Sequence, residues 1–443
     1  MTPTRRSRLV LLLSLLAATA VGLPVLAASQ APRAAPGTYL TFSPIDVVAN
    51  DVLYDAGRDV VYASVPSTGG PQGNSIVRIS PTGEVGKPIF VGSEPNALAL
   101  SADGRYLYVG IDGAAAYRRV DLTNDSVGPL WPLGRNSCGS FRAVDMVVLA
   151  DDPHALAVAR RNIQCDPNDE GIAVYDDGVM RPETTLPEAG TLAIEPSGDP
   201  NVLYGIAQPY LGDGLQIFAL SPDGITETQN EPGLLSSYAY DFHYQDGRIY
   251  DFDGRVIDEA TLTLLGTYSS HGPLVVDSDA GEIVFATGDE FTTRPALQAF
   301  ELDTFLPRFG ASIPSSNGYF TPADLLVTSD GYILREKYGR VARLQLITGW
   351  AVSGRVTDEY GYGLGGVEIS DGAGNTTLTD NDGQYQLAPL PDGTHTLAAA
   401  LDGRTFDPPS REVTVPPDMT GQDFEALPPQ AVWGLCLRHA SLV

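Results

Sequence analysis

Acidic side chains that could hold a metal ion lie close together near the middle of the chain. Asp166, Asp169 and Glu170 supply carboxylate oxygens, the ligand type that calcium prefers. Arg160 and Arg161 precede them and could neutralise the carboxylates instead. We therefore expect either a calcium site or an internally compensated charge cluster at this point, with calcium as the only cofactor that the sequence suggests.

Sequence patterns of other metal and catalytic sites are missing. The five histidines do not have the spacing of zinc ligands, and no HExxH, CxxC or Walker-type loop occurs. A GxSxG elbow is absent as well, so a Ser-His-Asp hydrolase has no sequence support.

The elements that position these residues come from an internal repeat. Two short runs of apolar, β-branched or aromatic residues flank a turn in each of seven copies: 51–65, 97–111, 146–159, 192–207, 240–252, 274–287 and 325–336. A second hairpin follows each copy: 75–83, 116–125, 171–178, 215–224, 254–262, 297–305 and 340–349. Two hairpins per repeat predict one four-stranded sheet per repeat.

Such a sheet cannot bury both faces alone, so we expect the repeats to pack face to face around an axis. This predicts an all-β fold, with a seven-bladed β-propeller over residues 38–349. Residues 40–48, ahead of the first repeat, could supply the outer strand of the last blade. Unrelated hairpins in a sandwich are the alternative.

The repeats resemble the blades of the YVTN-type and lactonase-like seven-bladed propellers, as in PNALALSADGRYLYVGIDG (95–113). The resemblance covers about 300 residues. It implies the propeller fold, but this fold hosts enzymes, binding proteins and scaffolds alike.

Propeller topology places two of the three cysteines on one face. Cys138 lies in the connection from the second to the third predicted blade, and Cys165 lies in the inner loop of the third. Because an exported chain enters an oxidising compartment, we expect a Cys138–Cys165 disulfide, with a free reactive thiol as the alternative. Cys436 would then stay unpaired.

The same face carries the longest predicted loops, where binding side chains usually lie. We expect an aromatic and acidic mouth there that could take a sugar, a peptide or a divalent cation. Solvated acidic loops without a ligand are the alternative reading for each residue. The candidate binding residues are Asn96, Arg142, Tyr210, Tyr238, His271 and Phe291.

A second domain is expected over residues 351–427, where strands and turns alternate without a helical stretch. The segment GVEISDGAGNTTLTDNDGQYQLAPLPDGTHTL resembles the carboxypeptidase regulatory-like (prealbumin-type, bacterial Ig-like) domains. That resemblance implies a small β-sandwich used as a spacer, stabiliser or adhesive module. Residues 428–443 do not fit the pattern and form a tail of unknown role.

Residues 1–28 have the pattern of an export signal: arginines, an apolar run and small residues at a cleavage point. The formal net charge is 27 − 55 = −28, which opposes binding to nucleic acid or to an anionic bilayer. No later run is long enough to insert into a membrane. We expect a secreted or cell-surface monomer.

Two functions remain open from the sequence. The first is a secreted, non-enzymatic binding or scaffold protein that presents a propeller loop face to an extracellular glycan, peptide or protein. The second is a lactonase-like hydrolase with a metal-assisted or His/Arg-assisted water, for which Arg142 and His271 are the best-placed residues.

Overall fold

The computed structural model describes residues 37–162, 164–165, 168–187, 191–207, 214–236, 239–291, 293–313 and 320–428. The predicted export signal and nearly all of the tail lie outside these residues. The described chain forms two compact units, Gly37–Gly349 and the part from Trp350 onward. Each unit is described by itself.

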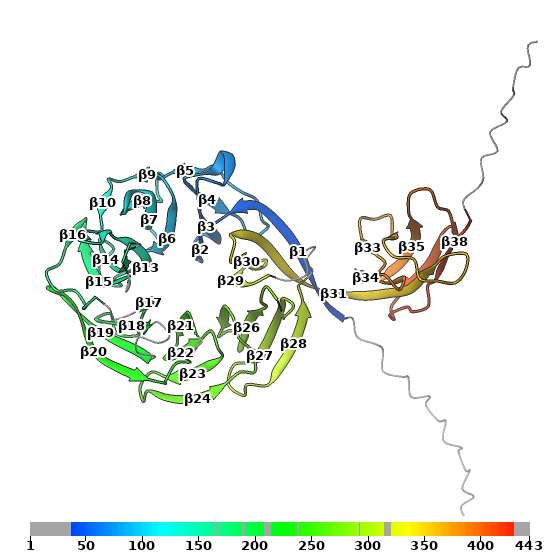
Figure 1. Ribbon diagram of the computed structural model, residues 1–443. Helices are drawn as coiled ribbons and strands as arrows, with labels where there is room; N and C mark the ends of the chain where they lie inside the picture. Colours follow the sequence, from blue (N-terminus) through cyan, green and yellow to red (C-terminus); the bar gives the residue numbers. More distant parts are fainter. Residues whose placement is uncertain are drawn as a thin grey trace, which may run out of the picture. The chain divides into compact units, whose positions relative to one another are not determined.

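The unit Gly37–Gly349 is a propeller of seven antiparallel sheets around a central axis, with the first strand of each sheet nearest the axis (Figure 1). This confirms the predicted seven-bladed, all-β fold. The first three blades contain β2 (Asp51–Asp55), β3 (Val60–Val65), β4 (Ser75–Ile79), β5 (Ile89–Phe90); β6 (Pro95–Leu100), β7 (Tyr106–Ile111), β8 (Ala116–Asp121), β9 (Ser126–Val127), β10 (Trp131–Pro132); β13 (Arg142–Val148), β14 (Ala155–Arg161), β15 (Asp169–Asp176), β16 (Val179–Met180).

The remaining blades repeat the same order from the axis outward. They contain β17 (Thr191–Pro196), β18 (Val202–Ala207), β19 (Gly214–Ser221), β20 (Gly224–Pro232); β21 (Phe242–Gln245), β22 (Arg248–Asp251), β23 (Arg255–Asp258), β24 (Thr263–Thr267); β25 (Leu274–Asp277), β26 (Glu282–Thr287), β27 (Ala296–Glu301), β28 (Pro307–Ser312); β29 (Pro322–Thr328), β30 (Gly331–Glu336), β31 (Arg340–Thr357) and β1 (Gly37–Val48). A short ribbon of β11 (Arg135–Asn136) and β12 (Gly139–Ser140) lies in the connection between the second and third blades.

The ring closes by pairing the two ends of the propeller sequence. β1 runs antiparallel to β31, with Gly37 opposite Gly349 and Ile45 opposite Val341. The predicted outer strand at 40–48 is therefore confirmed, and it begins three residues earlier. Closure in this way joins the first and last repeats by backbone hydrogen bonds as well as by packing.

Each of the seven seams between adjacent blades contains its own cluster of buried apolar side chains. The middle strands supply most of these residues and are buried on both faces, as in β7, where all six residues are buried. Strands covered on both sides are expected to be continuously apolar rather than alternating. The seams thus hold the first strands in fixed positions around the axis.

The C-terminal unit is a β-sandwich. One sheet contains the end of β31 with β34 (Gln384–Leu390), β36 (Phe406–Asp407) and β38 (Phe424–Ala426); the other contains β32 (Glu368–Ser370), β33 (Thr376–Leu378), β35 (Gly393–Ala400) and β37 (Arg411–Val415). Its core is one apolar cluster that includes Trp350, Leu390 and Phe424. From the sequence, strands are predicted at 352–357, 367–370, 376–379, 385–388, 395–401 and 411–415, and the structure adds β36 and β38.

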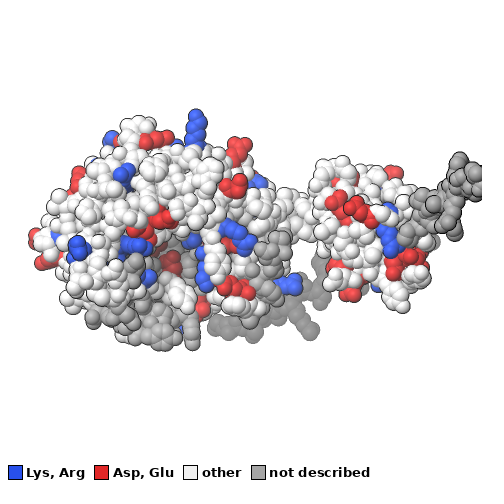
Figure 2. All heavy atoms as spheres, turned by 45° about the horizontal axis from the view of Figure 1, so that its top comes forward, with Lys and Arg blue, Asp and Glu red and all other residues white. Residues whose placement is uncertain are grey.

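In the described part of the chain, the only helical elements are two three-residue 3-10 turns, η1 (Gly70–Gln72) and η2 (Asp112–Ala114). Neither approaches the length or apolar character of a membrane-spanning helix. Acidic and basic side chains are interspersed on the face of the propeller that Figure 2 shows, and acidic atoms are visible in the hollow near its middle.

Candidate functional site

A cavity of about 650 Å³, called here the central cavity, lies between the first strands of the blades. Its walls come from β2, β6, β13, β17, β29 and β30, and from the residues just before β21. Aliphatic and acidic side chains share the lining. The charged lining residues are five acids and one base: Asp51, Asp145, Glu195, Asp241, Asp324 and Arg335. The walls therefore carry an excess of potential negative charge.

The four aspartates occupy one repeated position, the residue directly before the apolar run of a first strand. Around the ring, that position is Asp51, Ala97, Asp145, Ala193, Asp241, Pro273 and Asp324. A carboxylate thus alternates with an uncharged residue from blade to blade. The alternation therefore places a blade without an aspartate between most pairs of aspartates.

Asp51 fixes its own strand and the next blade at the same time. Its Oδ1 accepts a hydrogen bond from the N–H of Val52 (2.8 Å), and its Oδ2 accepts one from the N–H of Leu98 in the second blade (2.8 Å). Charged acceptors of backbone N–H groups make comparatively strong hydrogen bonds. The aspartate is therefore a bridge between neighbouring blades as well as a wall of the cavity.

Asp145 repeats this geometry two blades further on. Its oxygens accept the N–H of Met146 (2.7 Å) and the N–H of Ile194 in the fourth blade (2.8 Å). Asp241 accepts the N–H of Phe242 through Oδ1 (2.8 Å). Since a carboxylate oxygen has two lone pairs, these bonds leave acceptor capacity that can face the cavity.

Strict alternation fails where the ring closes, because the number of blades is odd. Asp324 of the seventh blade and Asp51 of the first are in neighbouring blades. Arg335, opposite Asp324 on β30, forms an ion pair with it at this seam. The single basic side chain of the cavity therefore lies where two aspartates are adjacent.

The environment of the cavity disfavours ionisation of these aspartates. Burial raises the pKa of Asp51 to about 7, and the charge of Asp324 adds to the rise. Burial likewise raises the pKa of Asp145 to about 7. For Asp241, burial and the charges of Asp145 and Glu195 hold the pKa well above its ordinary value. A positive charge in the cavity would reverse this effect.

Side chains two positions further along the first strands form a second level of the wall, since alternate residues of a strand share a face. Leu53, Ala99 and Val147 make this level largely aliphatic. Glu195 is its acidic member, with Oε1 3.6 Å from Nδ1 of His243. Burial opposes the charged imidazole, but the hydrogen bond and charge of Glu195 outweigh it and raise the pKa of His243.

Exposed aromatic side chains lie where the cavity opens. Tyr240 lines the cavity and is 72% exposed. A neighbouring pocket of about 400 Å³ includes Tyr338, which is also exposed, and Lys337, whose Nζ is 3.2 Å from Glu290 Oε1. The two hollows share three lining residues: Asn50, Asn96 and Arg335. We call this edge the mouth of the cavity.

Two of the predicted binding residues meet through a carboxylate that the sequence did not single out. Asn96 lines the cavity, and its Nδ2 donates to Asp112 Oδ2 (3.2 Å). Arg142 Nη1 lies 3.9 Å from the same oxygen. Within the described part of the chain, the buried Oδ1 of Asp112 has no hydrogen-bond partner. Burial raises the pKa of Asp112, partly offset by Arg142.

The other predicted binding residues are not brought together. Phe291 is 81% exposed on the β26–β27 loop, and His271 is exposed on the connection before β25. The described lining of the central cavity includes neither Arg142 nor His271. Tyr210 and Tyr238 lie outside the described residues.

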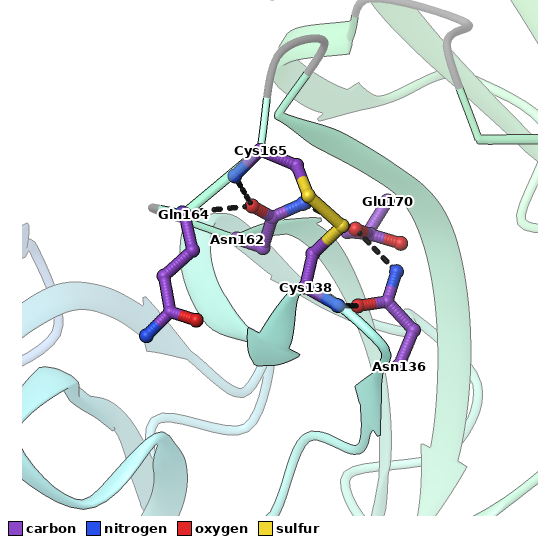
Figure 3. The surroundings of a disulfide bond; sticks show 6 residues. All are labelled: Asn136, Cys138, Asn162, Gln164, Cys165 and Glu170. Atoms are coloured by element: carbon purple, nitrogen blue, oxygen red, sulfur yellow. Dashed lines mark hydrogen bonds between the residues drawn. A yellow bond between two sulfur atoms is a disulfide. The ribbon is translucent and has the colours of Figure 1, made fainter.

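The structure contains the disulfide that the sequence favours. Cys138 and Cys165 are bonded with their Cα atoms 5.6 Å apart, and amide side chains surround the bond (Figure 3). Asn136 accepts the N–H of Cys138 (2.8 Å), and Asn162 accepts the N–H of Cys165 (2.8 Å). Both asparagines also donate to Glu170 Oε1. Glu170 thus holds the two disulfide loops together.

Two of the candidate calcium ligands, Asp169 and Glu170, accept hydrogen bonds from groups of the protein itself. Asp169 is buried, and its oxygens accept the N–H groups of Gly171 (3.0 Å) and Thr191 (3.2 Å). Asp166 lies outside the described residues. Over the ranges that the structure describes, no three His, Cys, Asp or Glu side chains gather as metal ligands would.

The strongest feature of the site, the alternating aspartates, was not among the predicted residues. From the sequence, the binding residues are expected in loops and blade connections, whereas Asp51, Asp145 and Asp324 belong to strands. The signal was present nevertheless, because aligning the seven repeats places all four aspartates at one position. Asp112 gave no comparable signal, since its role depends on the loop conformation around η2.

No curated protein sequence matches the chain. Among solved structures, the β-propeller domain of Cps50 (Swd1) from Myceliophteria thermophila has a TM-score of 0.52 at 12% identity, covering 69% of this chain and 98% of that domain. The WD40 β-propeller domain of Doa1 (0.48, 13%, 70% and 97%) and dihydro-heme d1 dehydrogenase NirN in complex with DHE (0.47, 14%, 68% and 67%) are less similar. At 12% identity, the similarity to the Cps50 domain supports the propeller fold and nothing about function. Residues 351–425 match the family model of the carboxypeptidase regulatory-like domain.

Proposed function

We propose that this chain is a secreted, non-enzymatic binding protein whose propeller receives an extracellular ligand at the mouth of the central cavity. The observation that carries the proposal is the cavity itself: a hollow of about 650 Å³ lined by convergent acidic side chains, with the exposed ring of Tyr240 also in its lining. Concave sites with a few convergent polar groups are the usual places for ligands. The C-terminal unit then acts as a spacer or attachment module, as its family resemblance suggests.

Secretion is part of this proposal. It is supported by the signal-like residues 1–28 and by a disulfide, a bond that persists in oxidising compartments. The net charge of −28 favours ligands that are neutral or positively charged over anionic polymers.

Binding to printed glycan and peptide arrays tests the proposal. We expect the full chain to bind one class of probe, Tyr240→Ala to weaken that binding, and the control Phe90→Ala to leave it unchanged. Phe90 is also a well-exposed aromatic, but it lies on the outer strand β5. The absence of binding, or binding that Tyr240→Ala does not affect, would contradict the proposal.

A lactonase-like hydrolase is the second candidate, and one observation favours it. Glu195 on the cavity wall pairs with His243, the arrangement of an acid–base dyad. Hydrolysis of a lactone panel by the full chain, abolished by His243→Gln, would establish this activity and overturn the binding-only proposal. Loss through Arg142→Ala or His271→Ala would instead point to the residues that the sequence suggested.

A further inference from the structure

The charge balance of the central cavity indicates which chemical group it can accept. Five acidic side chains and one arginine line it, and that arginine is already paired with Asp324. The chain as a whole is strongly acidic, so its field adds to the local one. A cationic ligand would offset this charge, whereas an anionic ligand would add to an unfavourable burial of like charges.

The hydrogen-bonding capacity of the wall agrees with a donor-rich ligand. Asp51 and Asp145 each accept two backbone N–H groups, and Asp241 accepts one. All three still have free lone pairs, whereas an ammonium group brings three donors and no acceptor. Because the aspartates alternate around the ring, separate ammonium groups can meet separate carboxylates.

The second level of the wall suits an aliphatic chain between such groups. Leu53, Ala99 and Val147 present methyl groups to the cavity beneath the aspartates. Methylene groups of a ligand gain about 0.8 kcal/mol each when they are fully buried. At the mouth, the ring of Tyr240 offers a face over which a cation can rest.

We propose that the central cavity binds aliphatic ammonium groups, either those of a free polyamine or the side chains of lysines in a protein ligand. This inference rests on the proposed binding function and specifies its ligand. Binding brings a positive charge beside the aspartates and therefore lowers their pKa, so each complex formed near neutral pH releases protons.

Isothermal titration of the full chain tests the inference. The probes are 1,4-diaminobutane, spermidine and an acetylated lysine amide, with 1,4-butanediol as the neutral counterpart of the diamine. We expect the amines to bind and the diol not to bind. We also expect the heat at pH 7 to depend on the ionisation enthalpy of the buffer, because protons are released. Tight binding of spermidine alone identifies a free polyamine, and comparable binding of the lysine amide identifies a protein side chain.

Asp241→Asn is the informative variant. The amide keeps Oδ1 as acceptor for the N–H of Phe242 and removes the charge. We expect about a tenfold loss of amine affinity, the effect of one charged hydrogen bond. Asp223→Asn, an equal charge change at an exposed turn, is the matched control and should leave affinity unchanged. Tyr240→Ala provides a second variant that does not disturb the core.

Three outcomes would overturn the inference: no saturable binding of any amine, equal binding of the diol, or binding of calcium chloride that excludes the amines. Asp241→Asn with wild-type affinity would also contradict it. If the arrays show a ligand that depends on Tyr240 while the amines fail, only this inference falls. If both experiments fail, the proposed function falls as well.

Discussion

Two aspartates, one in each unit, differ in the direction of their pKa shift. Asp241 faces the central cavity of the propeller, and its pKa is held well above the ordinary value. The side chain of Asp371 in the sandwich is fully covered (0% exposed), yet its pKa is lowered. Covering a carboxylate with protein atoms is therefore not enough by itself to raise its pKa.

The difference lies in the groups around each carboxylate. Burial opposes the charge of Asp371, but its Oδ1 accepts the N–H groups of Ala373 (2.9 Å) and Asn375 (3.0 Å), and its Oδ2 accepts Nδ2 of Asn375 (2.7 Å). His395 lies 3.5 Å away. Asp241 instead has other acids as neighbours. The sandwich compensates its carboxylate internally, whereas the propeller leaves its carboxylate to be compensated from outside.

Removing the compensated carboxylate, that of Asp371, should cause the largest change in stability. We expect Asp371→Ala to destabilise the C-terminal unit by about 2–3 kcal/mol, because the N–H groups of Ala373 and Asn375 lose a charged acceptor that is itself fully covered. Hydrogen exchange of the full chain, followed by mass spectrometry of peptides from residues 376–415, measures this loss. Asp380→Ala is the matched control: Asp380 accepts the N–H groups of Asp382 and Gln384 in the same kind of turn, but it is exposed. Equal losses in the two variants would show that burial of the turn is irrelevant.

Removing an uncompensated carboxylate, that of Asp241, should instead increase the stability of the protein. The raised pKa of Asp241 means that the folded propeller binds more protons than the unfolded chain between the ordinary aspartate pKa and neutral pH. This contribution to stability is fully present below the ordinary pKa and is lost as the pH rises. We therefore expect Asp241→Asn to stabilise the propeller by about 1 kcal/mol at pH 8 and to change little at pH 4.

Urea unfolding of the full chain at the two pH values, followed by circular dichroism, checks this expectation. Asp223→Asn again controls for the change in net charge. Destabilisation by Asp241→Asn at pH 8 would show that the ionised carboxylate is compensated in the free protein, and the contrast with Asp371 would disappear.

The repeat made the propeller predictable, whereas the site needed a comparison across repeats. Apolar runs on both sides of each turn fix seven sheets, and the requirement to bury both faces fixes their packing. The disulfide followed from topology once the blades were counted. The aspartates were missed because each looks ordinary within its own strand, and only the ring brings four of them around one cavity. The bridge from Asn96 through Asp112 to Arg142 depends on loop conformation, which no periodic pattern specifies.

Replacing an exposed aspartate should change stability least, and it gives a reference for the two changes above. Asp125 forms an ion pair with Arg78 between the first two blades, and both side chains are partly in water. The hydrogen bond from Arg78 lowers the pKa of Asp125, as in a compensated site. Solvent screens such a pair, so we expect Asp125→Asn to cost about 0.5 kcal/mol or less, with a still smaller cost in 1 M salt. The same urea measurements test this. A loss as large as that of Asp371→Ala would mean that one arginine at the surface compensates a carboxylate as well as the N–H groups around the covered Asp371 do. The direction of the pKa shift would then predict the stability change whether or not the carboxylate is covered.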